Sequence, residues 1–166
     1  MLIDSSVIFN KNGKTKLGRN KFYKNKKATK LSLMTDSNGF PLSVLFMKSN
    51  YHDNTVFERH IQDALILMPN KNKTVLADKA YSSYKNYKLL EKNNIKHIIP
   101  PRKNMKIAKT YTFDKKVYIK RNKIENVFAI LKNYKRINCR YDKYIKTFSR
   151  FIYLALSIFA INIINK

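Results

Sequence analysis

Three carboxylates of this chain lie where an acid could do chemistry. The 166 residues include 35 Lys and Arg but only 10 Asp and Glu. Asp4 lies inside the apolar run 2–9, and Asp78 directly follows the apolar run 74–77. A charge in or beside a buried strand is costly unless it is paired or bound to a metal ion. Taken singly, each aspartate is explained as well by a strand-end cap or an ion pair.

The third acid, Glu125, lies in a basic segment that we expect to form a helix over 117–134. At about 100° per residue, four polar side chains of this helix fall within about 60° of one another. They are Tyr118, Arg121, Glu125 and Lys132. The adjacent face is apolar and should pack on a sheet; it carries Ile124, Val127, Phe128 and Leu131.

Two interpretations of Glu125 follow from this spacing. It forms an ordinary i, i+4 ion pair with Arg121, worth about 0.3 kcal/mol, or it joins Asp4 and Asp78 as a third metal ligand. Oxygen ligands suit a hard cation such as Mg²⁺ or Mn²⁺. Two such ions about 4 Å apart can hold the attacking and leaving oxygens of a phosphodiester.

The net charge of +25 favours a polyanionic partner. Nucleic acid is the first candidate and an anionic membrane surface the second, and a basic protein from an AT-rich gene is the plain alternative. Nine cations lie in 11–30 and nine in 119–146, and both clusters are expected at the rim of the carboxylate site. Such contacts position DNA without reading its sequence. The residues predicted to bind DNA are Tyr118, Arg121, Lys132, Lys135, Arg136, Arg140 and Lys143.

Cysteine usage and apolar runs indicate the compartment. Cys139 is the single cysteine, so no intramolecular disulfide forms, which suits a reducing environment. The N-terminal segment does not have the pattern of a signal peptide. The apolar run 151–164 has 14 residues, fewer than the ~20 of a membrane span. We therefore expect a buried core helix, no membrane contact and a cytoplasmic protein.

The order of elements predicts an α/β fold. Strands are expected at 2–9, 30–35, 40–48, 74–77 and 96–100. Helices should begin near Asp53 or Asn54, after Ser82 or Ser83, and at about 117 and 144. A turn at 36–39 makes the second and third strands a hairpin. The expected fold is a single domain, 1–166, with three antiparallel N-terminal strands, two further strands in one mixed sheet, and helices on both faces.

The spacing Tyr118-x2-Arg121-x3-Glu125-x6-Lys132 resembles the YREK signature of DDE transposases in the insertion-sequence 4/5 group. VLADKAY at 75–81 resembles the second-aspartate motif of that family, and LIDSS at 2–6 resembles the first. Segments 35–42, 51–53 and 136–143 are also similar to family segments. The resemblance covers nearly the whole chain.

This resemblance implies a ribonuclease-H-like fold with Asp4, Asp78 and Glu125 as a catalytic triad that binds two divalent ions. The implied reaction cuts a DNA strand at the end of an element, and the freed 3′-hydroxyl then attacks target DNA. Arg121 and Lys132 would hold phosphates, and Tyr118 would position the DNA backbone or a carboxylate. A bacterial protein that associates with the nucleoid when bound to DNA and works as a homodimer is expected.

The chain departs from the family pattern at several points. Family chains usually carry a helical region that recognises element ends before the first aspartate, whereas Asp4 is almost at the start of this sequence, and Ala80 and Cys139 stand where Gly and Thr are common. We expect either a truncated copy or the second frame of a two-frame element, whose upstream frame supplies an N-terminal helper product. Two rival functions are a transposase fragment that binds nucleic acid without catalysis and another ribonuclease-H-like nuclease.

Overall fold

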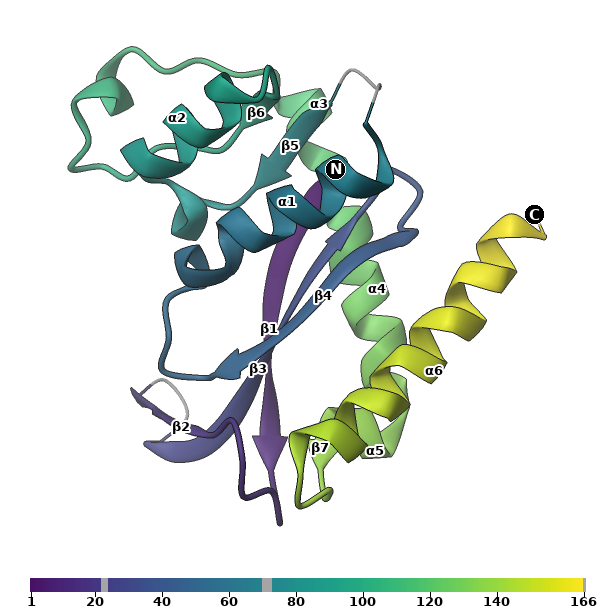
Figure 1. Ribbon diagram of the computed structural model, residues 1–166. Coiled ribbons are helices and arrows are strands. Elements are labelled where there is room, and N and C mark those ends of the chain that lie inside the picture. Colours follow the sequence, from purple (N-terminus) through teal and green to yellow (C-terminus); the bar gives the residue numbers. More distant parts are fainter. Residues whose placement is uncertain (22–23, 70–72, 166) are drawn as a thin grey trace.

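A mixed sheet of seven strands forms the centre of the protein in the computed structural model, which describes residues 1–21, 24–69 and 73–165 (Figure 1). The longest strand pairs are antiparallel, β4 with β3 and β3 with β1. On its other side β1 pairs in parallel with β5, and β5 pairs in parallel with β6. The bounds are β1 Leu2–Asn10, β3 Lys26–Thr35, β4 Pro41–Lys48, β5 Thr74–Ala77 and β6 Lys96–Ile98.

Two short strands extend the predicted set. β2 (Gly18–Asn20) pairs with the start of β3, and β7 (Cys139–Arg140) pairs with the end of β1. Neither has an alternating apolar pattern, because two or three residues are too few to show one. The three antiparallel strands and the two further strands expected from the sequence are all present, so the predicted α/β class is confirmed.

The β3–β4 hairpin closes as its turn residues predict. The Asp36 carboxylate accepts hydrogen bonds from the N–H groups of Asn38 and Phe40, both at 2.8 Å. Gly39 has a φ of +92°, which a residue with a side chain rarely adopts. A Cβ at Gly39 would also lie 3.2 Å from the Val127 side chain. The turn therefore lies directly against the helix that carries Glu125.

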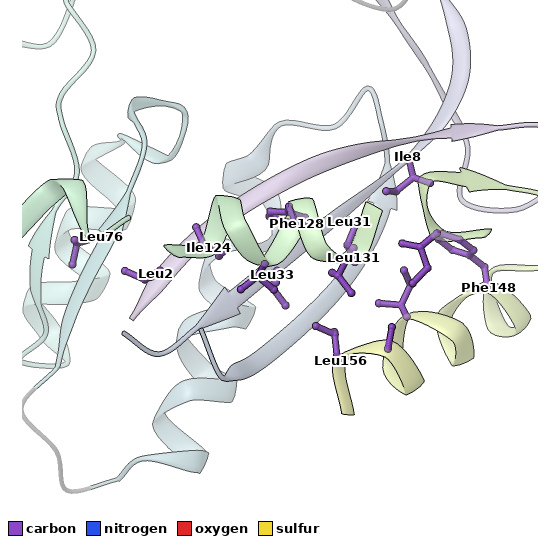
Figure 2. Packing of buried hydrophobic residues seen from close by; sticks show 14 residues of the cluster. Leu2, Ile8, Leu31, Leu33, Leu76, Ile124, Phe128, Leu131, Phe148 and Leu156 are labelled. Carbon is purple, nitrogen blue, oxygen red and sulfur yellow. The ribbon is translucent and has the colours of Figure 1, made fainter. Parts of the chain in front are cut away.

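Helices cover both faces of the sheet, as expected (Figure 1). α1 (Phe57–Leu67) packs on the face of Ile3 and Met34, which alternate with Leu2 and Leu33 along their strands. The opposite face carries α4 (Asn122–Asn133) and the first half of α6 (Ile145–Ile164). The apolar residues predicted for the helix face lie in this core: Ile124, Val127, Phe128 and Leu131 (Figure 2).

The remaining helical segments are short, apart from α2. The 3-10 turn η2 (Asp53–Val56) precedes α1, and Ser83 caps α2 (Tyr84–Lys92) by accepting a hydrogen bond from the Asn86 N–H. The others are η3 Lys79–Tyr81, η4 Lys106–Lys109, α3 Lys115–Ile119 and α5 Lys135–Asn138.

The predicted helix over 117–134 is divided in two. α3 ends at Ile119 and α4 begins at Asn122. Between them the backbone tightens, because the Arg121 N–H donates to the Tyr118 carbonyl and the Ile124 N–H donates to the Arg121 carbonyl. Tyr118 and Arg121 thus precede α4, so they do not lie on one continuous helix with Glu125 and Lys132 as the spacing predicts.

The last helix differs from the core helix predicted at 144–164. The part of α6 up to Leu156 is anchored by Phe148, Ile152, Ala155 and Leu156, whereas the part after Leu156 extends away from the sheet (Figure 1). Leu154, Ile158, Ile161 and Ile164 are exposed. By length and composition α6 is long and apolar enough to cross a membrane, but one such helix is weak evidence, because core helices meet the same criterion. The apolar pattern of 151–164 predicts a buried helix, but it does not show that the end of α6 extends past the sheet on which the helix packs.

His60 links α1 to two strands inside the protein. Its Nε2 lies 2.8 Å from the Ser32 hydroxyl, and its Nδ1 lies 2.8 Å from the Ser43 hydroxyl. Burial lowers the pKa of His60 to about 4, against the charge of Asp63. The folded protein therefore holds this imidazole neutral at a pH where the unfolded chain protonates it.

We expect His60 to make the protein less stable in acid. As the pH falls from about 6.5 towards 4, the unfolded state binds a proton that the folded state excludes, which costs up to about 3 kcal/mol of unfolding free energy. Urea unfolding of the wild type and His60→Gln between pH 4 and 7 should show the wild type losing more stability in acid. The exposed His52→Gln serves as the control. Parallel pH profiles for wild type and His60→Gln would contradict this expectation.

Candidate active site

Asp4 and Asp78 lie at equivalent positions on neighbouring strands. The parallel β1–β5 register pairs Leu2 with Leu76 and Ile3 with Ala77, and the two aspartates come next. Adjacent strands run about 5 Å apart, so the two carboxylates start from neighbouring backbone positions where the ladder ends. The sequence prediction that two strand ends bring these acids together agrees with this register.

Glu125 reaches the same region from α4. Arg121 lies between the acids: its Nη1 donates to the Asp4 Oδ2 at 3.0 Å, and its Nη2 donates to the Glu125 Oε1. The side chains of Arg121 and Asp4 are 15% and 20% exposed, whereas that of Glu125 is 49% exposed. The i, i+4 ion pair is therefore present, and it is part of a larger bridge that also includes Asp4.

The electrostatics of Asp4 reflect all three carboxylates. The pKa of Asp4 is raised to about 6, mainly because its carboxyl group is buried. The charges of Asp78 and Glu125 raise this pKa as well. The Ser5 N–H, which donates to the Asp4 Oδ1 at 2.8 Å, and the Arg121 charge lower it. The three acids thus lie close enough to affect one another.

Within the described residues, however, no group of three His, Cys, Asp or Glu side chains is arranged to hold a metal ion. The three acids can affect the pKa of Asp4 without forming a metal site, because a charge acts over a longer distance than a coordination bond. Arg121 engages one oxygen of Asp4 and one of Glu125. The donor set itself fits a divalent cation, because three carboxylates provide the hard oxygen ligands that Mg²⁺ and Mn²⁺ prefer.

Two of the predicted DNA-binding residues, Tyr118 and Arg121, lie at this site. The Arg121 guanidinium lies 5.9 Å from the ring centroid of the half-buried Tyr118, and the Phe113 ring meets the same tyrosine edge-on at 5.2 Å. Lys132 lies near the end of α4 and is partly exposed. Lys135 and Lys143 are exposed, but they flank β7, which pairs with the end of β1 remote from Asp4. These cations are accessible to phosphate groups.

Arg140 has a different environment from the one expected. It is 0% exposed, and its guanidinium donates to the carbonyls of Thr15, Asp142 and Lys143 and to the Thr29 hydroxyl. Its N–H groups bind segments far apart in the sequence, so a DNA contact by Arg140 does not fit this geometry. The sequence shows a cation in a basic segment but not the carbonyls that surround it.

Arg136 is largely committed to the protein as well. Its Nε and Nη2 donate to the buried Asp142 at 3.2 and 2.6 Å, and its guanidinium lies 3.6 Å from the Phe151 ring centroid. The contact between Arg136 and Phe151 holds the start of α5 against α6. Because Asp142 accepts two of its hydrogen bonds, Arg136 has only part of its donors left for DNA.

Apart from Lys30, which pairs with Asp53 near Ser5, the first basic cluster, 11–30, lies away from the carboxylates. Asp4 pairs with Leu33 and Phe9 with Ala28, while β2 pairs with residues 26–28. Five residues along a strand span roughly 17 Å. The register thus places this cluster at the far end of β1, not at the rim of the site as predicted.

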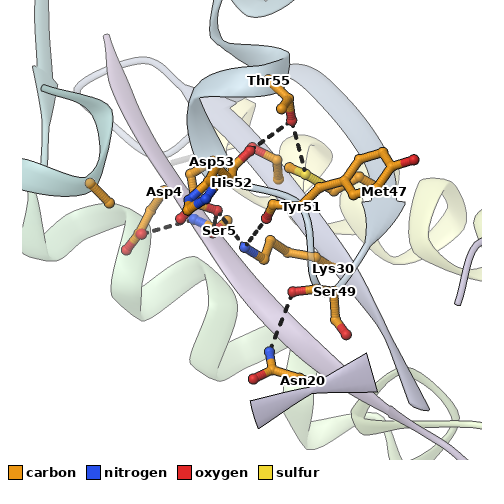
Figure 3. Close-up of polar contacts among 12 residues, drawn as sticks. Asp4, Ser5, Asn20, Lys30, Met47, Ser49, Tyr51, His52, Asp53 and Thr55 are labelled. Atoms are coloured by element: carbon orange, nitrogen blue, oxygen red, sulfur yellow. Dashed lines mark hydrogen bonds and ion pairs between the residues drawn. The ribbon is translucent and has the colours of Figure 1, made fainter. Parts of the chain in front are cut away.

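A polar network behind Asp4 was not predicted (Figure 3). The Asp53 Oδ1 accepts a hydrogen bond from the Ser5 hydroxyl at 2.5 Å and from the Lys30 Nζ at 3.0 Å. The Lys30 Nζ also donates to the Tyr51 carbonyl at 2.8 Å. From the sequence Asp53 was interpreted only as a helix cap; its proximity to Ser5 depends on the strand register.

The comparisons with known proteins identify the family. The family model "Transposase DDE domain" matches residues 1–160, so the chain belongs to this family of transposase domains. No curated protein matches the chain. The mixed sheet flanked by helices agrees with the α/β fold expected for a member of this family. Nothing in these comparisons supports a separate helper product.

One similar solved structure is a simian T-cell lymphotropic virus intasome in complex with the PP2A regulatory subunit B56 gamma. The similarity has a TM-score of 0.46 at 14% sequence identity. It covers 89% of this chain and 46% of that chain, so this chain spans about half the length of its structural neighbour.

We expect Arg140 to be needed for stability. Arg140→Met should lower the unfolding free energy by at least about 3 kcal/mol, because several buried carbonyls lose their donors. Lys143→Met removes an exposed charge nearby and should change it by less than about 0.5 kcal/mol. Urea unfolding measures both variants, and equal stabilities would show that Arg140 does not support the fold.

Proposed function

We propose that this chain carries the catalytic domain of a DDE transposase of the insertion-sequence 4/5 group, in which Asp4, Asp78 and Glu125 act together. The observation that carries the proposal is the β1–β5 register with the Arg121 bridge, which gathers three acids from distant segments. Membership in the transposase DDE family supports the same reaction class. The proposed reaction is DNA strand cleavage followed by transfer of the freed 3′-hydroxyl to target DNA.

Divalent cations fit this proposal, and Asp4, Asp78 and Glu125 would hold them. When bound, two such ions supply activation of the attacking oxygen and stabilisation of the leaving oxygen. Mg²⁺ and Mn²⁺ are the proposed ions. The Ser5 N–H orients the Asp4 carboxylate by donating to one of its oxygens. The Lys30–Asp53 pair in turn fixes the Ser5 hydroxyl.

The surrounding cations bind and orient the DNA in this proposal. Lys132, Lys135 and Lys143 contact phosphates, because they are accessible and lie on the segments that follow Glu125. Tyr118 packs beside Arg121 and positions the DNA backbone or a catalytic carboxylate. With a net charge of +25, most of the binding energy comes from counterion release and carries no sequence preference.

Several finer features belong to the same proposal. The described chain forms one domain, the DNA partners are the ends of an insertion sequence and its target, and two copies work together. The protein acts in the bacterial cytoplasm, at the nucleoid.

One observation favours a second candidate, a transposase fragment that binds DNA without cutting it. In the part of the chain that the structure describes, no three side chains converge as a metal site, since Arg121 already engages two of the acids. A DNA-binding protein without catalysis would keep the cations and have no need of a metal. The two functions differ in metal-dependent cleavage.

We expect the protein to nick supercoiled plasmid in the presence of Mg²⁺ or Mn²⁺. Asp78→Asn and Glu125→Gln should each reduce nicking by about a hundredfold or more, because each removes a charged metal ligand. Glu58→Gln is the matched control, since Glu58 pairs with Lys85 on the surface. DNA binding with no metal-dependent nicking in the wild type would favour the non-catalytic candidate.

We also expect DNA affinity to fall steeply with salt. Lys132→Ala should reduce the slope of log K against log[salt] by about 0.9 for duplex DNA, the value for one phosphate contact. Lys88→Ala removes an exposed charge from α2 and should leave the slope unchanged. Fluorescence anisotropy at several salt concentrations measures both slopes. A response to salt that is flat in the wild type would exclude binding through phosphates.

A further inference from the structure

Arg121 holds two of the three acids that the proposed reaction needs. Its two terminal nitrogens donate to different carboxylates, one on β1 and one on α4. The Arg121 side chain is only 15% exposed. The guanidinium thus lies between Asp4 and Glu125, in the position that a shared cation would take.

The charge balance of the site explains why a cation is needed between these acids. Asp4 lies among the negative charges of Asp78 and Glu125, and its own carboxyl group is mostly buried. Within the described residues, Asp4 and Glu125 form ion pairs with Arg121 alone, and Asp78 forms none. Without Arg121 the three carboxylates would repel one another in a region with little water.

We propose that Arg121 is an internal counter-cation, which holds Asp4 and Glu125 together in the metal-free protein and gives way when divalent cations bind the same oxygens. The released guanidinium then binds a DNA phosphate. This inference rests on the proposed function, since it assigns the carboxylates to metal binding. Arg121 is a positioning residue here, because it acts through the carboxylates.

Two features make this exchange feasible. Glu125 is about half exposed, so it can turn away from Arg121 towards another cation. The Arg121 Nε is buried without a hydrogen-bond partner, so the bridging position is incompletely satisfied.

The exchange couples metal binding to DNA binding. DNA phosphates that attract Arg121 weaken its hold on Asp4 and Glu125, so the carboxylates become more available to a metal ion. By linkage, metal ions that occupy the carboxylates release Arg121 and strengthen DNA binding by the same factor. Removal of Arg121 should eliminate this part of the coupling.

The test is an Mn²⁺ titration of the full chain, with free Mn²⁺ measured by electron paramagnetic resonance. Arg121→Ala should bind Mn²⁺ about tenfold more tightly than the wild type, because no guanidinium competes for the oxygens. Arg121→Gln keeps a hydrogen-bond donor without the charge and should also bind more tightly, which protects the test if the alanine variant does not fold.

The matched control is Lys123→Ala, which removes the same charge two residues from Glu125. Lys123 is exposed and takes part in no ion pair found in the described chain. It should change Mn²⁺ affinity by less than about twofold, since an exposed charge is screened by solvent. An equal gain from Lys123→Ala would mean that only the overall charge matters and would overturn the proposal.

Two further outcomes decide the proposal. A short duplex should tighten Mn²⁺ binding more in the wild type than in Arg121→Ala, and equal tightening would contradict the exchange. Weaker or unchanged Mn²⁺ binding by both Arg121 variants would overturn it as well. The proposed function fails separately, if Asp78→Asn and Glu125→Gln bind Mn²⁺ and nick plasmid like the wild type.

Discussion

The pairing of β1 with β5 is the constraint on which the candidate site depends. The parallel ladder contains two residue pairs and ends where Asp4 and Asp78 begin. β1 is fastened on its other side by an antiparallel ladder with β3 that extends from Leu2 to Phe9. β1 thus pairs with strands on both of its sides, and Asp4 lies at the point where its pairing with β5 ends. The buried alternation of Leu2 and Ile3 towards opposite faces fixes which side Asp4 occupies.

The charge distribution sets the other condition. A protein with a net charge of +25 repels itself, yet the partly buried Asp4 and the half-exposed Glu125 lie together around a single arginine. The carboxylate site requires a nearby positive charge. The excess of lysines elsewhere in the protein does not supply it, because most lysine side chains are solvent-exposed. A site of this kind draws a polyanion to its rim through the lysines, and a small cation to its centre through the acids.

The corrections share one physical origin. Arg140 and the second half of α6 were interpreted from their own segments, as a DNA-binding cation and a buried helix. Arg140 is enclosed because β7 pairs with the end of β1 and brings the carbonyl of Thr15 to its guanidinium. α6 is exposed because its last turns pass the edge of the elements it packs on. Neither neighbour is visible in the local pattern.

The sequence by itself determined the α/β class, the hairpin at Asp36 and the apolar face of α4, because these depend on side-chain period and turn chemistry. It also identified the acids and their family through their spacing. Tertiary structure alone decided that Arg121 bridges Asp4 and Glu125, and that Lys30 and Asp53 support Ser5. The Arg121–Glu125 contact is local, but the contacts of Arg121 with Asp4 and of Asp53 with Ser5 join residues that are distant in the chain. They arise from strand register and helix packing, which local patterns do not encode.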